Sequence, residues 1–420
     1  MNMPVQNPKY SIIIPSRNGG EYLPYCVKTI INQEYDNYEL ILSDDHSTDG
    51  TRAYLSALVH PNVTIINPPE GLSMTEHWEW ALSHARGEWL IFVGQDDGLQ
   101  PYFFRLADRL TEIARKANLR TIMSERAYFF WQGCEFVYGD MAVGYQARNA
   151  ARIHNCRYEA MKALLGLQQY FDLPEMYTTS LFHRDIVSEA KRKQQGRLFL
   201  THPQDANLAA IACSLEKRYL MSSLPLGWAG QSPKSAGIAV TSIKPELDVS
   251  EKSDGRDALK KEYVEKINKS ELKYHFLAGD FLFANLSIYF WQSFLQTQNL
   301  RRPLANRILT SKFFKTMLFC RVLNEINSAD NAELRLPMFK EILRRNQCSF
   351  VMINLGSKVS SPIAEIILLA SRLIRTIMRL LSSRIHYTVA WSDDMSMDIL
   401  KASSQVNTLI TKKNWLNAQV

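Results

Sequence analysis

The chain has 420 residues, 46% of them hydrophobic and 22% charged, a composition that is typical of globular proteins and excludes long disordered regions. The length predicts two or three domains, because one compact core seldom extends beyond about 250–300 residues. The 49 Lys and Arg exceed the 42 Asp and Glu by 7, and a net charge of +7 excludes neither nucleic acid, a membrane surface nor a phosphorylated substrate as partner.

The first hundred residues alternate between short apolar runs and segments with helical spacing. Strands are predicted at 10–15, 38–44, 62–67 and 88–93, with helices between them at 21–33, 49–59 and 73–86. Alternating strands and helices indicate βαβ units, and therefore an α/β fold with a mostly parallel sheet. Such sheets bind ligands beyond the C-terminal ends of their strands, so the loops that follow the strands are the places to search.

The pattern between residues 100 and 240 is mixed. Helices are predicted near 103–117 and 204–215, and the segments TIMSERAYFF and MYTTSLFH have the composition of strands. The charged stretch 244–273 looks like a linker that enters a helix, and the chain beyond it reads as helical to its end. The sequence thus predicts an α/β domain at 1–245 and a mainly α-helical region at 246–420.

The cysteine pattern and the absence of export signals favour a cytoplasmic protein. The six cysteines are scattered without a CxxC pair, which disfavours a disulfide framework or a structural zinc site and favours reduced thiols. The first residues lack the basic and apolar regions of a secretory signal. Segment 281–300 has no charge, but seven Asn, Ser and Gln residues make it too polar to span a bilayer, and a buried or interfacial helix is expected there.

Three acidic sites occur at predicted strand ends or helix starts. Asp44 and Asp45 follow the second strand, Asp96 and Asp97 follow the fourth, and Asp205 opens the helix at 204–215. Carboxylates in these places can bind a ribose, a base or a hard divalent cation. Each site taken alone also fits ordinary turn or N-cap chemistry.

Taken together, three segments give a more specific indication: IIIPSRN, then YELILSDDHSTDGT, then GEWLIFVGQDDGLQP. Their order and spacing resemble the nucleotide-sugar-binding half of family 2 glycosyltransferases with the GT-A fold, over roughly residues 8–240. The resemblance implies that the N-terminal domain is Rossmann-like and binds a nucleotide-sugar. Its residue-by-residue implications place the nucleotide-sugar on Pro15, Ser16, Arg17, Asn18, Asp44, Asp45 and Asp96.

The resemblance also implies a divalent metal, Mn²⁺ or Mg²⁺, held by Asp97 with Gln231 as a weak ligand, and a catalytic base at Asp205. The chain departs from the family pattern at three places. Gln204 stands where an acid often precedes the base, Glu76–His77 replace an Arg-Asn pair, and no His occurs in the loop around Gln231. Another cation is then needed near the diphosphate, and the candidates are Arg17, Arg86 and Lys234.

The implied function is inverting transfer of a sugar from a nucleotide-sugar to a hydroxyl of a glycan or lipid-linked glycan, as in bacterial-type surface polysaccharide synthesis. A hydrolase with paired carboxylates is disfavoured, because adjacent acids cannot flank a glycosidic bond from both sides. The alternative is a catalytically inactive nucleotide-sugar-binding or scaffold protein of a glycan assembly complex. A nucleic-acid partner is disfavoured, since the N-terminal domain has no basic stripe interleaved with aromatic residues.

The positive charge is concentrated in one part of the chain. Residues 301–385 contain 15 Lys and Arg and 5 Asp and Glu, a net charge of +10, so the rest of the chain carries −3. A helix predicted near 362–385 has Arg372, Arg375 and Arg379 on one polar arc and a wide apolar arc opposite. This helix either contacts an anionic membrane, which would place the protein peripherally on the cytosolic face of the inner membrane, or packs on its own domain. The oligomeric state is left open.

Overall fold

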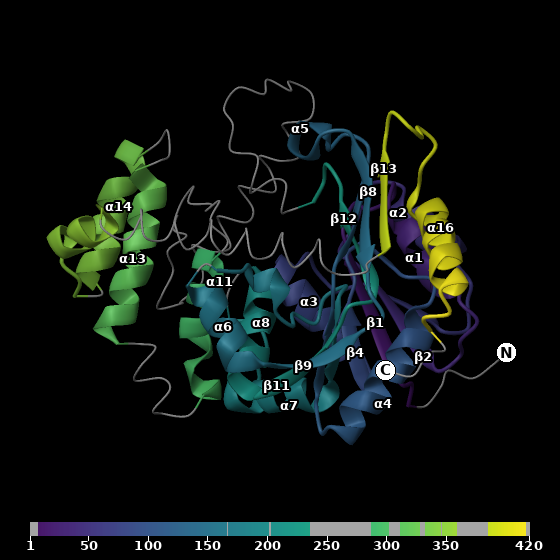
Figure 1. Cartoon of the computed structure of the whole chain (residues 1–420), viewed down its shortest axis with the longest axis horizontal. Helices are drawn as coiled ribbons and strands as arrows, with labels where there is room; N and C mark the ends of the chain where they lie inside the picture. Colours follow the sequence, from purple (N-terminus) through teal and green to yellow (C-terminus); the bar gives the residue numbers. More distant parts are fainter. Residues whose placement is uncertain are drawn as a thin grey trace.

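The computed structural model describes residues 7–165, 167–200, 203–235, 287–301, 311–327, 332–345, 347–358 and 385–416. An eight-stranded sheet with the order β3-β2-β1-β4-β10-β6-β11-β9 forms its centre (Figure 1). As predicted, the first four strands are parallel to one another, whereas β10 pairs antiparallel with β4. The strands of this sheet are β1 (Tyr10–Ser16), β2 (Tyr38–Asp44), β3 (Val63–Ile66), β4 (Trp89–Phe92), β6 (Thr121–Ser124), β9 (Ala151–Asn155), β10 (Ser180–His183) and β11 (Arg218–Ser222).

Helices cover both faces of this sheet because its central strands are apolar on both sides. In β1, Ile12 and Ile14 pack on one face and Ile13 on the other, as expected for side chains that alternate along a strand. The first face is covered by α1 (Leu23–Ile31) and α4 (Phe103–Lys116), and α16 (Ile399–Lys412) packs against α1. The second is covered by α3 (Met74–Ser83), α7 (Arg184–Lys193) and α8 (Gln204–Leu215).

The helix starts predicted from the sequence lie within a few residues of the observed ones. The start of α3 is fixed by a capping box. Ser73 Oγ accepts from Glu76 N at 3.2 Å, and Glu76 Oε2 accepts from Ser73 N at 3.0 Å. The predicted helix at 204–215 coincides with α8. Other short helices here are α2 (Thr51–Ala57), α5 (Glu135–Tyr138), α6 (Cys156–Leu164) and the 3₁₀ turn η1 (Tyr170–Asp172).

A second sheet, with the order β13-β8-β7-β12-β5, stands beside the first. The single strand-like segment predicted at 121–130 is two strands, β6 and β7, which belong to different sheets. The strands of the second sheet are β5 (Gly98–Leu99), β7 (Ala127–Phe130), β8 (Met141–Ala147), β12 (Gly227–Gln231) and β13 (Ile385–Ala390).

The end of the chain returns to the N-terminal part. Strand β13 pairs antiparallel with β8, and α16 packs against α1 (Figure 1). The expectation of helix to the end of the chain is therefore wrong at 385–390. The period-two alternation of IHYTVA and its β-branched residues explain the strand.

The helical region begins with α11 (Ser287–Gln296), whose side chains from Ile288 to Leu295 are buried, in agreement with the buried helix expected there. Trp291 Nε1 donates to the Leu164 carbonyl at 2.8 Å and so fixes α11 to the end of α6. The remaining helical elements are the 3₁₀ turn η2 (Thr297–Leu300), α13 (Lys312–Asn327), α14 (Ala332–Arg345) and residues 350–358.

Within the described ranges, no helix combines the length and the apolar character needed to cross a bilayer. Three predictions fall outside those ranges: the linker at 244–273, the domain boundary at 245/246, and almost all of the amphipathic helix at 362–385.

Candidate active site

The C-terminal ends of β1, β2 and β4 lie side by side and bring the predicted loops together. Ser16, at the end of β1, is in register with Asp44, at the end of β2, and Phe92 ends β4 on the other side of β1. The loops after these strands are joined by direct hydrogen bonds. Asn18 N donates to Ser47 Oγ at 2.8 Å, and Asp45 N donates to the Ser16 carbonyl at 3.0 Å.

Asp44 and Asp45 are both buried at this edge. Asp44 Oδ1 accepts from the amide and the hydroxyl of Ser47, while its buried Oδ2 has no hydrogen bond and lies 3.5 Å from Arg52 Nε. Asp45 Oδ1 accepts from Leu72 N at 3.1 Å, and its Oδ2 lies 3.6 Å from Arg17 Nη1. Each acid therefore keeps one oxygen near an Arg.

Ser16 and Asn18 are used to build the loops. Ser16 Oγ and Arg17 N both donate to Gln95 Oε1, at 2.8 and 3.0 Å, which ties the first loop to the loop after β4. Asn18, at φ 54°, accepts from Thr48 N through its Oδ1 at 2.8 Å. Pro15, opposite Ser43 in the sheet, is partly buried. The side chains of Ser16 and Asn18 thus shape the predicted nucleotide pocket.

The histidine of the Glu76–His77 departure lies against this pocket. His77 Nε2 and Ser43 Oγ are 2.7 Å apart, and both residues are buried. Burial lowers the pKa of His77, although the charges of Asp45 and Asp44 act in the opposite direction. A neutral imidazole here supports the loop after β2 without adding a cation.

Asp97 is the anchor of the loop after β4. Its side chain is buried, with Oδ1 accepting from Gly230 N at 2.6 Å and Oδ2 accepting from Gly94 N at 2.9 Å and Thr178 Oγ1 at 2.6 Å. Burial, followed by the charge of Asp96, raises the pKa of Asp97 to about 6. Both oxygens are thus already engaged by the protein, which argues against the predicted role of Asp97 as metal ligand.

Asp96 is the more accessible acid of the pair. Its Oδ2 accepts from the hydroxyls of Ser232, at 2.7 Å, and Ser235. Burial raises the pKa of Asp96, and these hydroxyls act in the opposite direction. Gln231, the predicted weak ligand, uses its Oε1 to accept from Tyr138 OH at 3.0 Å. The oxygen atoms gathered at this point are therefore those of Asp96, Ser232 and Ser235, and Gln231 is not among them.

Gly230 permits the close approach of β12 to the loop after β4. A Cβ atom at Gly230 would lie 1.7 Å from the Asp96 carbonyl oxygen and 2.5 Å from its carbonyl carbon. Both are backbone atoms, so no side-chain rotation can relieve the clash. Only a residue without a side chain fits here.

Replacing Gly230 with alanine is expected to destabilise the fold by about 3 kcal/mol or more, at or beyond the upper end of ordinary overpacking. Gly144 is a matched control in the same sheet, because a Cβ there would meet its nearest atom, Met141 Sδ, at 3.5 Å. Urea unfolding of Gly230→Ala and Gly144→Ala measures both free energies. Equal unfolding free energies of the two variants would contradict the clash.

Asp205 lies in the first turn of α8. Its Oδ2 accepts from Tyr170 OH at 3.0 Å, and its Oδ1 accepts from Ala206 N at 2.8 Å. Burial raises the pKa of Asp205, against the lowering effect of these hydrogen bonds and of the charge of Arg126. A carboxylate with a raised pKa is suited to accept a proton.

The structure adds an ion pair that the sequence reasoning missed. Glu175 is fully buried, pairs with Arg126, and has an Oε2 atom without a hydrogen bond. Burial raises the pKa of Glu175 to about 8, with Arg126 acting against this and Asp205 adding to it. The available signal was a charged residue within or beside an apolar strand-like segment, which is costly unless it is paired.

Tyr177 links the two groups of acids. Burial, followed by the charges of Asp97, Asp96 and Asp205, holds the pKa of the Tyr177 phenol well above its ordinary value. A Cβ at Gly94 would lie 2.3 Å from Tyr177 OH and 2.7 Å from Asp97 Oδ2, so the phenol and this carboxylate adjoin. The adjacent acids Asp96 and Asp97 and the distant Asp205 therefore all act on one phenol, which Asp97 adjoins.

Two of the cations predicted near a diphosphate lie at this edge, and the third does not. Arg17 is beside Asp45, and Lys234 lies 3.2 Å from Glu21 and acts on Asp49, which anchors the N-terminus of α2. Arg86 instead pairs with the buried Glu39 at 2.8 Å, near the start of β4. Arg86 is excluded as a diphosphate ligand, because it lies at the opposite end of the strands.

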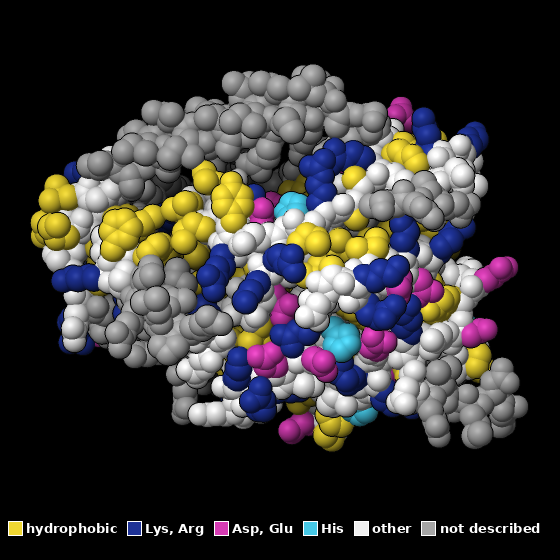
Figure 2. All heavy atoms as spheres, turned by 60° about the horizontal axis from the view of Figure 1, so that its bottom comes forward, with side chains coloured by type: hydrophobic (Ala, Val, Ile, Leu, Met, Phe, Trp, Pro, Cys, Tyr) yellow, Lys and Arg dark blue, Asp and Glu magenta, His cyan; other side chains and the backbone are white. Residues whose placement is uncertain are grey.

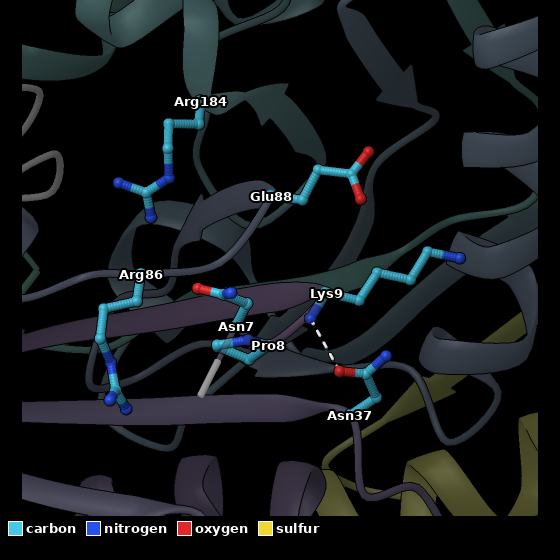
Figure 3. Close-up of a pocket in the computed structure, with 7 residues that line it drawn as sticks. All are labelled: Asn7, Pro8, Lys9, Asn37, Arg86, Glu88 and Arg184. Carbon is cyan, nitrogen blue, oxygen red and sulfur yellow. Dashed lines mark hydrogen bonds between the residues drawn. The ribbon is translucent and has the colours of Figure 1, made fainter. Parts of the chain in front are cut away.

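A cavity of about 350 Å³ is found at that opposite end (Figure 3). Figure 3 shows Lys9, Glu88 and Arg184 extending from different elements in different directions around it. Since parallel sheets bind ligands at the C-terminal ends of their strands, this cavity is distinct from the candidate site. It is lined by Asn7, Pro8, Lys9, Asn37, Arg86, Glu88 and Arg184.

Comparison with known proteins finds, for the first part of the chain, the same family that its sequence motifs resemble. Residues 11–126 match the family model "Glycosyl transferase family 2". A PGL/p-HBAD biosynthesis glycosyltransferase of Mycobacterium tuberculosis is 34% identical over 110 residues, which are 26% of this chain and 41% of that protein. The GalNAc(5)-diNAcBac-PP-undecaprenol beta-1,3-glucosyltransferase of Campylobacter jejuni is 31% identical over 114 residues, 26% of this chain and 35% of that protein.

The matches thus span about two fifths or less of these relatives. Among solved structures, S. aureus TarS 1–349 in complex with UDP aligns with a TM-score of 0.40 and 13% identity, over 80% of this chain and 87% of that one. The family model confirms the predicted family resemblance over residues 11–126, and the sheet with helices on both faces confirms the predicted α/β fold class.

Proposed function

We propose, starting from the family 2 glycosyltransferase module that residues 11–126 form, that the chain moves a sugar from a nucleotide-sugar donor to a hydroxyl of a glycan or lipid-linked glycan. The observation that carries this proposal is the contact of Asp97 with the Tyr177 phenol, on which the charges of Asp96 and Asp205 also act. Asp96 and Asp97 lie at the donor end, and their charges, together with that of Asp205, all act on the Tyr177 phenol.

The donor would lie across the ends of β1 and β2. Its base and ribose would meet the oxygens of Asp44 and Asp45 that remain near arginines, with the loop of Pro15, Ser16, Arg17 and Asn18 as the wall. Its diphosphate would extend towards Asp96, with Arg17 and Lys234 as the cations at this edge. Open parallel sheets with helices on both faces bind their ligands in this place, beyond the C-terminal ends of the strands.

Asp205 is the proposed base. It removes the proton from the acceptor hydroxyl as that oxygen attacks the anomeric carbon, and the bond from the anomeric carbon to the nucleoside diphosphate breaks on the opposite face. A single displacement inverts the configuration. The proton ends on Asp205, and the negative charge ends on the departing diphosphate.

The oxygen atoms around Asp96 fit a divalent cation such as Mn²⁺ or Mg²⁺, since hard cations take carboxylate and hydroxyl oxygens together with substrate phosphates. When bound, the cation would neutralise charge on the leaving diphosphate. We assign Asp96 to it in place of Asp97, because the oxygens of Asp97 already accept three hydrogen bonds. Ser232 and Ser235, which donate to Asp96, hold this carboxylate in place.

Donor binding can be tested by thermal shift with UDP-, GDP-, dTDP- and CMP-sugars, each with and without Mn²⁺. One donor at 100 times its dissociation constant is expected to stabilise the protein by about 2.7 kcal/mol, and more weakly without the cation. The nucleotide without the sugar serves as a matched ligand control. A panel in which no donor changes the melting temperature would contradict the proposal.

The second candidate function is a catalytically inactive nucleotide-sugar-binding or scaffold protein. The Gln204 departure favours it, because an acid often stands at that position. If the wild type transfers sugar and an Asp205 variant does not, the chain is the enzyme and not the inactive binding protein. We further propose a peripheral location on the cytosolic face of the inner membrane, with the basic segment 362–385 as one contact.

A further inference from the structure

The outer surface of the helical region exposes large apolar side chains. Phe313 is 67% exposed, Val351 65%, Met352 63% and Leu355 56%. Figure 2 shows hydrophobic side chains gathered at the end of the molecule where α13 and α14 lie in Figure 1, with Lys and Arg at the margins. A surface of this kind is seldom left to solvent in a soluble monomer.

The helix at 350–358 has apolar residues on both of its sides. Ile353 and Ser357 face inward and are buried, and the Cys320 thiol donates to the Ile353 carbonyl at 3.4 Å. Val351, Met352 and Leu355 follow the i, i+1, i+4 spacing of one helix side, and they point outward. The inward side accounts for the packing of this helix, whereas the outward side does not contribute to it.

Lysines surround this apolar surface. Lys312 is exposed and begins α13, next to Phe313 in the chain. Lys340 Nζ lies 4.9 Å from the centroid of the Phe350 ring, and Lys358 is exposed at the other end of the helix. The described parts of 311–358 contain eight Lys and Arg and three Glu, a net charge of +5.

We propose that this outer surface, formed by Phe313, Val351, Met352 and Leu355 with Lys312, Lys340 and Lys358, docks the protein on an anionic lipid bilayer. Apolar side chains of this kind enter the boundary between headgroups and acyl chains, and lysines around them attract anionic headgroups. The combination disfavours a nucleic acid, because Val, Met and Leu offer nothing to phosphates or base edges.

The outer surface is joined to the candidate active site by packed helices. Phe314 of α13 contacts Trp291 of α11, with ring centroids 5.7 Å apart, and α11 packs against α8, which begins beside Asp205. Docking would therefore hold the acceptor side of the site near the lipid. Only this last step rests on the proposed function, because membrane binding can be measured without any transfer.

The test is flotation of the full-length chain with vesicles of phosphatidylcholine mixed with phosphatidylglycerol, and with vesicles of phosphatidylcholine alone. The wild type is expected to float with the anionic vesicles, and less as salt is added. The double variant V351S/L355S should bind about tenfold more weakly. The double variant K340E/K358E should lose most of the salt-sensitive part of its binding to anionic vesicles.

The matched control is Met395→Ser, which removes a methionine that is 69% exposed between β13 and α16 and should float like the wild type. Urea unfolding checks that every variant is folded, without any need for donor binding. The proposal is overturned if the wild type does not float with anionic vesicles, or if V351S/L355S floats as well as the wild type. It is also overturned if V351S/L355S changes only the oligomeric state, which would make this surface a contact between copies of the chain.

Discussion

Replacing Asp205 with asparagine is expected to lower kcat for sugar transfer by about 10²–10⁴-fold, the range that a positioned acid–base group contributes. The amide has nearly the same shape and keeps an oxygen for the hydrogen bond from Tyr170, so the fold and donor binding should be preserved. Initial rates of transfer and donor-induced thermal shifts, measured on the same preparation, separate the loss of chemistry from the loss of binding.

The pH dependence of the rate gives a second measure of the same role. The base acts when ionised, so activity should fall as the pH drops through the pKa of Asp205, which burial raises above the ordinary value of an aspartate. The Asp205→Asn variant should lose this acidic limb. Asp172→Asn, which changes an exposed acid of η1, is the matched control. It should keep both the transfer rate and the acidic limb of the pH–rate profile. A normal transfer rate in Asp205→Asn would remove Asp205 as the base.

The adjacent acids after β4 are expected to respond in opposite ways to the same substitution. Asp96→Asn should fold normally and lose the cation-dependent part of donor binding, because it removes the charge from the more accessible carboxylate. Asp97→Asn should lower the free energy of unfolding by about 1.5–3 kcal/mol, since an amide nitrogen would face groups that now donate to the carboxylate.

Urea unfolding and a Mn²⁺ titration of donor binding, applied to both variants, distinguish the two roles. Each variant serves as the matched control for the other, because the change is the same and the residues are adjacent. If Asp97→Asn unfolds like the wild type and loses the Mn²⁺ response while Asp96→Asn retains it, then Asp97 is the ligand.

The sequence predicted the first four strands well, because the periodicity of the apolar residues and the residues at the strand ends decide where they lie. Four apolar runs became β1 to β4, and the rule for parallel sheets correctly brought the loops after Ser16, Asp44 and Phe92 together. Asp205 could be placed near them only through the family resemblance, because it lies some 110 residues further along the chain.

The division of roles within the site could not be predicted, since it depends on backbone hydrogen bonds. Nothing in the Asp96–Asp97 dipeptide tells which carboxylate receives the amides of Gly94 and Gly230. The pairing of Arg126 with Glu175 joins segments about fifty residues apart, so its long-range geometry is likewise absent from local patterns. The outer surface of the helical region also appears only when burial is known.

The position of β13 has a consequence for synthesis of the chain. Strand β8 has β7 on one side, and its other edge is covered only when residues 385–390 arrive. During translation the ribosome must add more than two hundred residues after β8 before that edge is paired. An uncovered strand edge is a template for pairing with other chains, so a nascent or truncated chain that stops before residue 385 should aggregate more readily than the full-length protein.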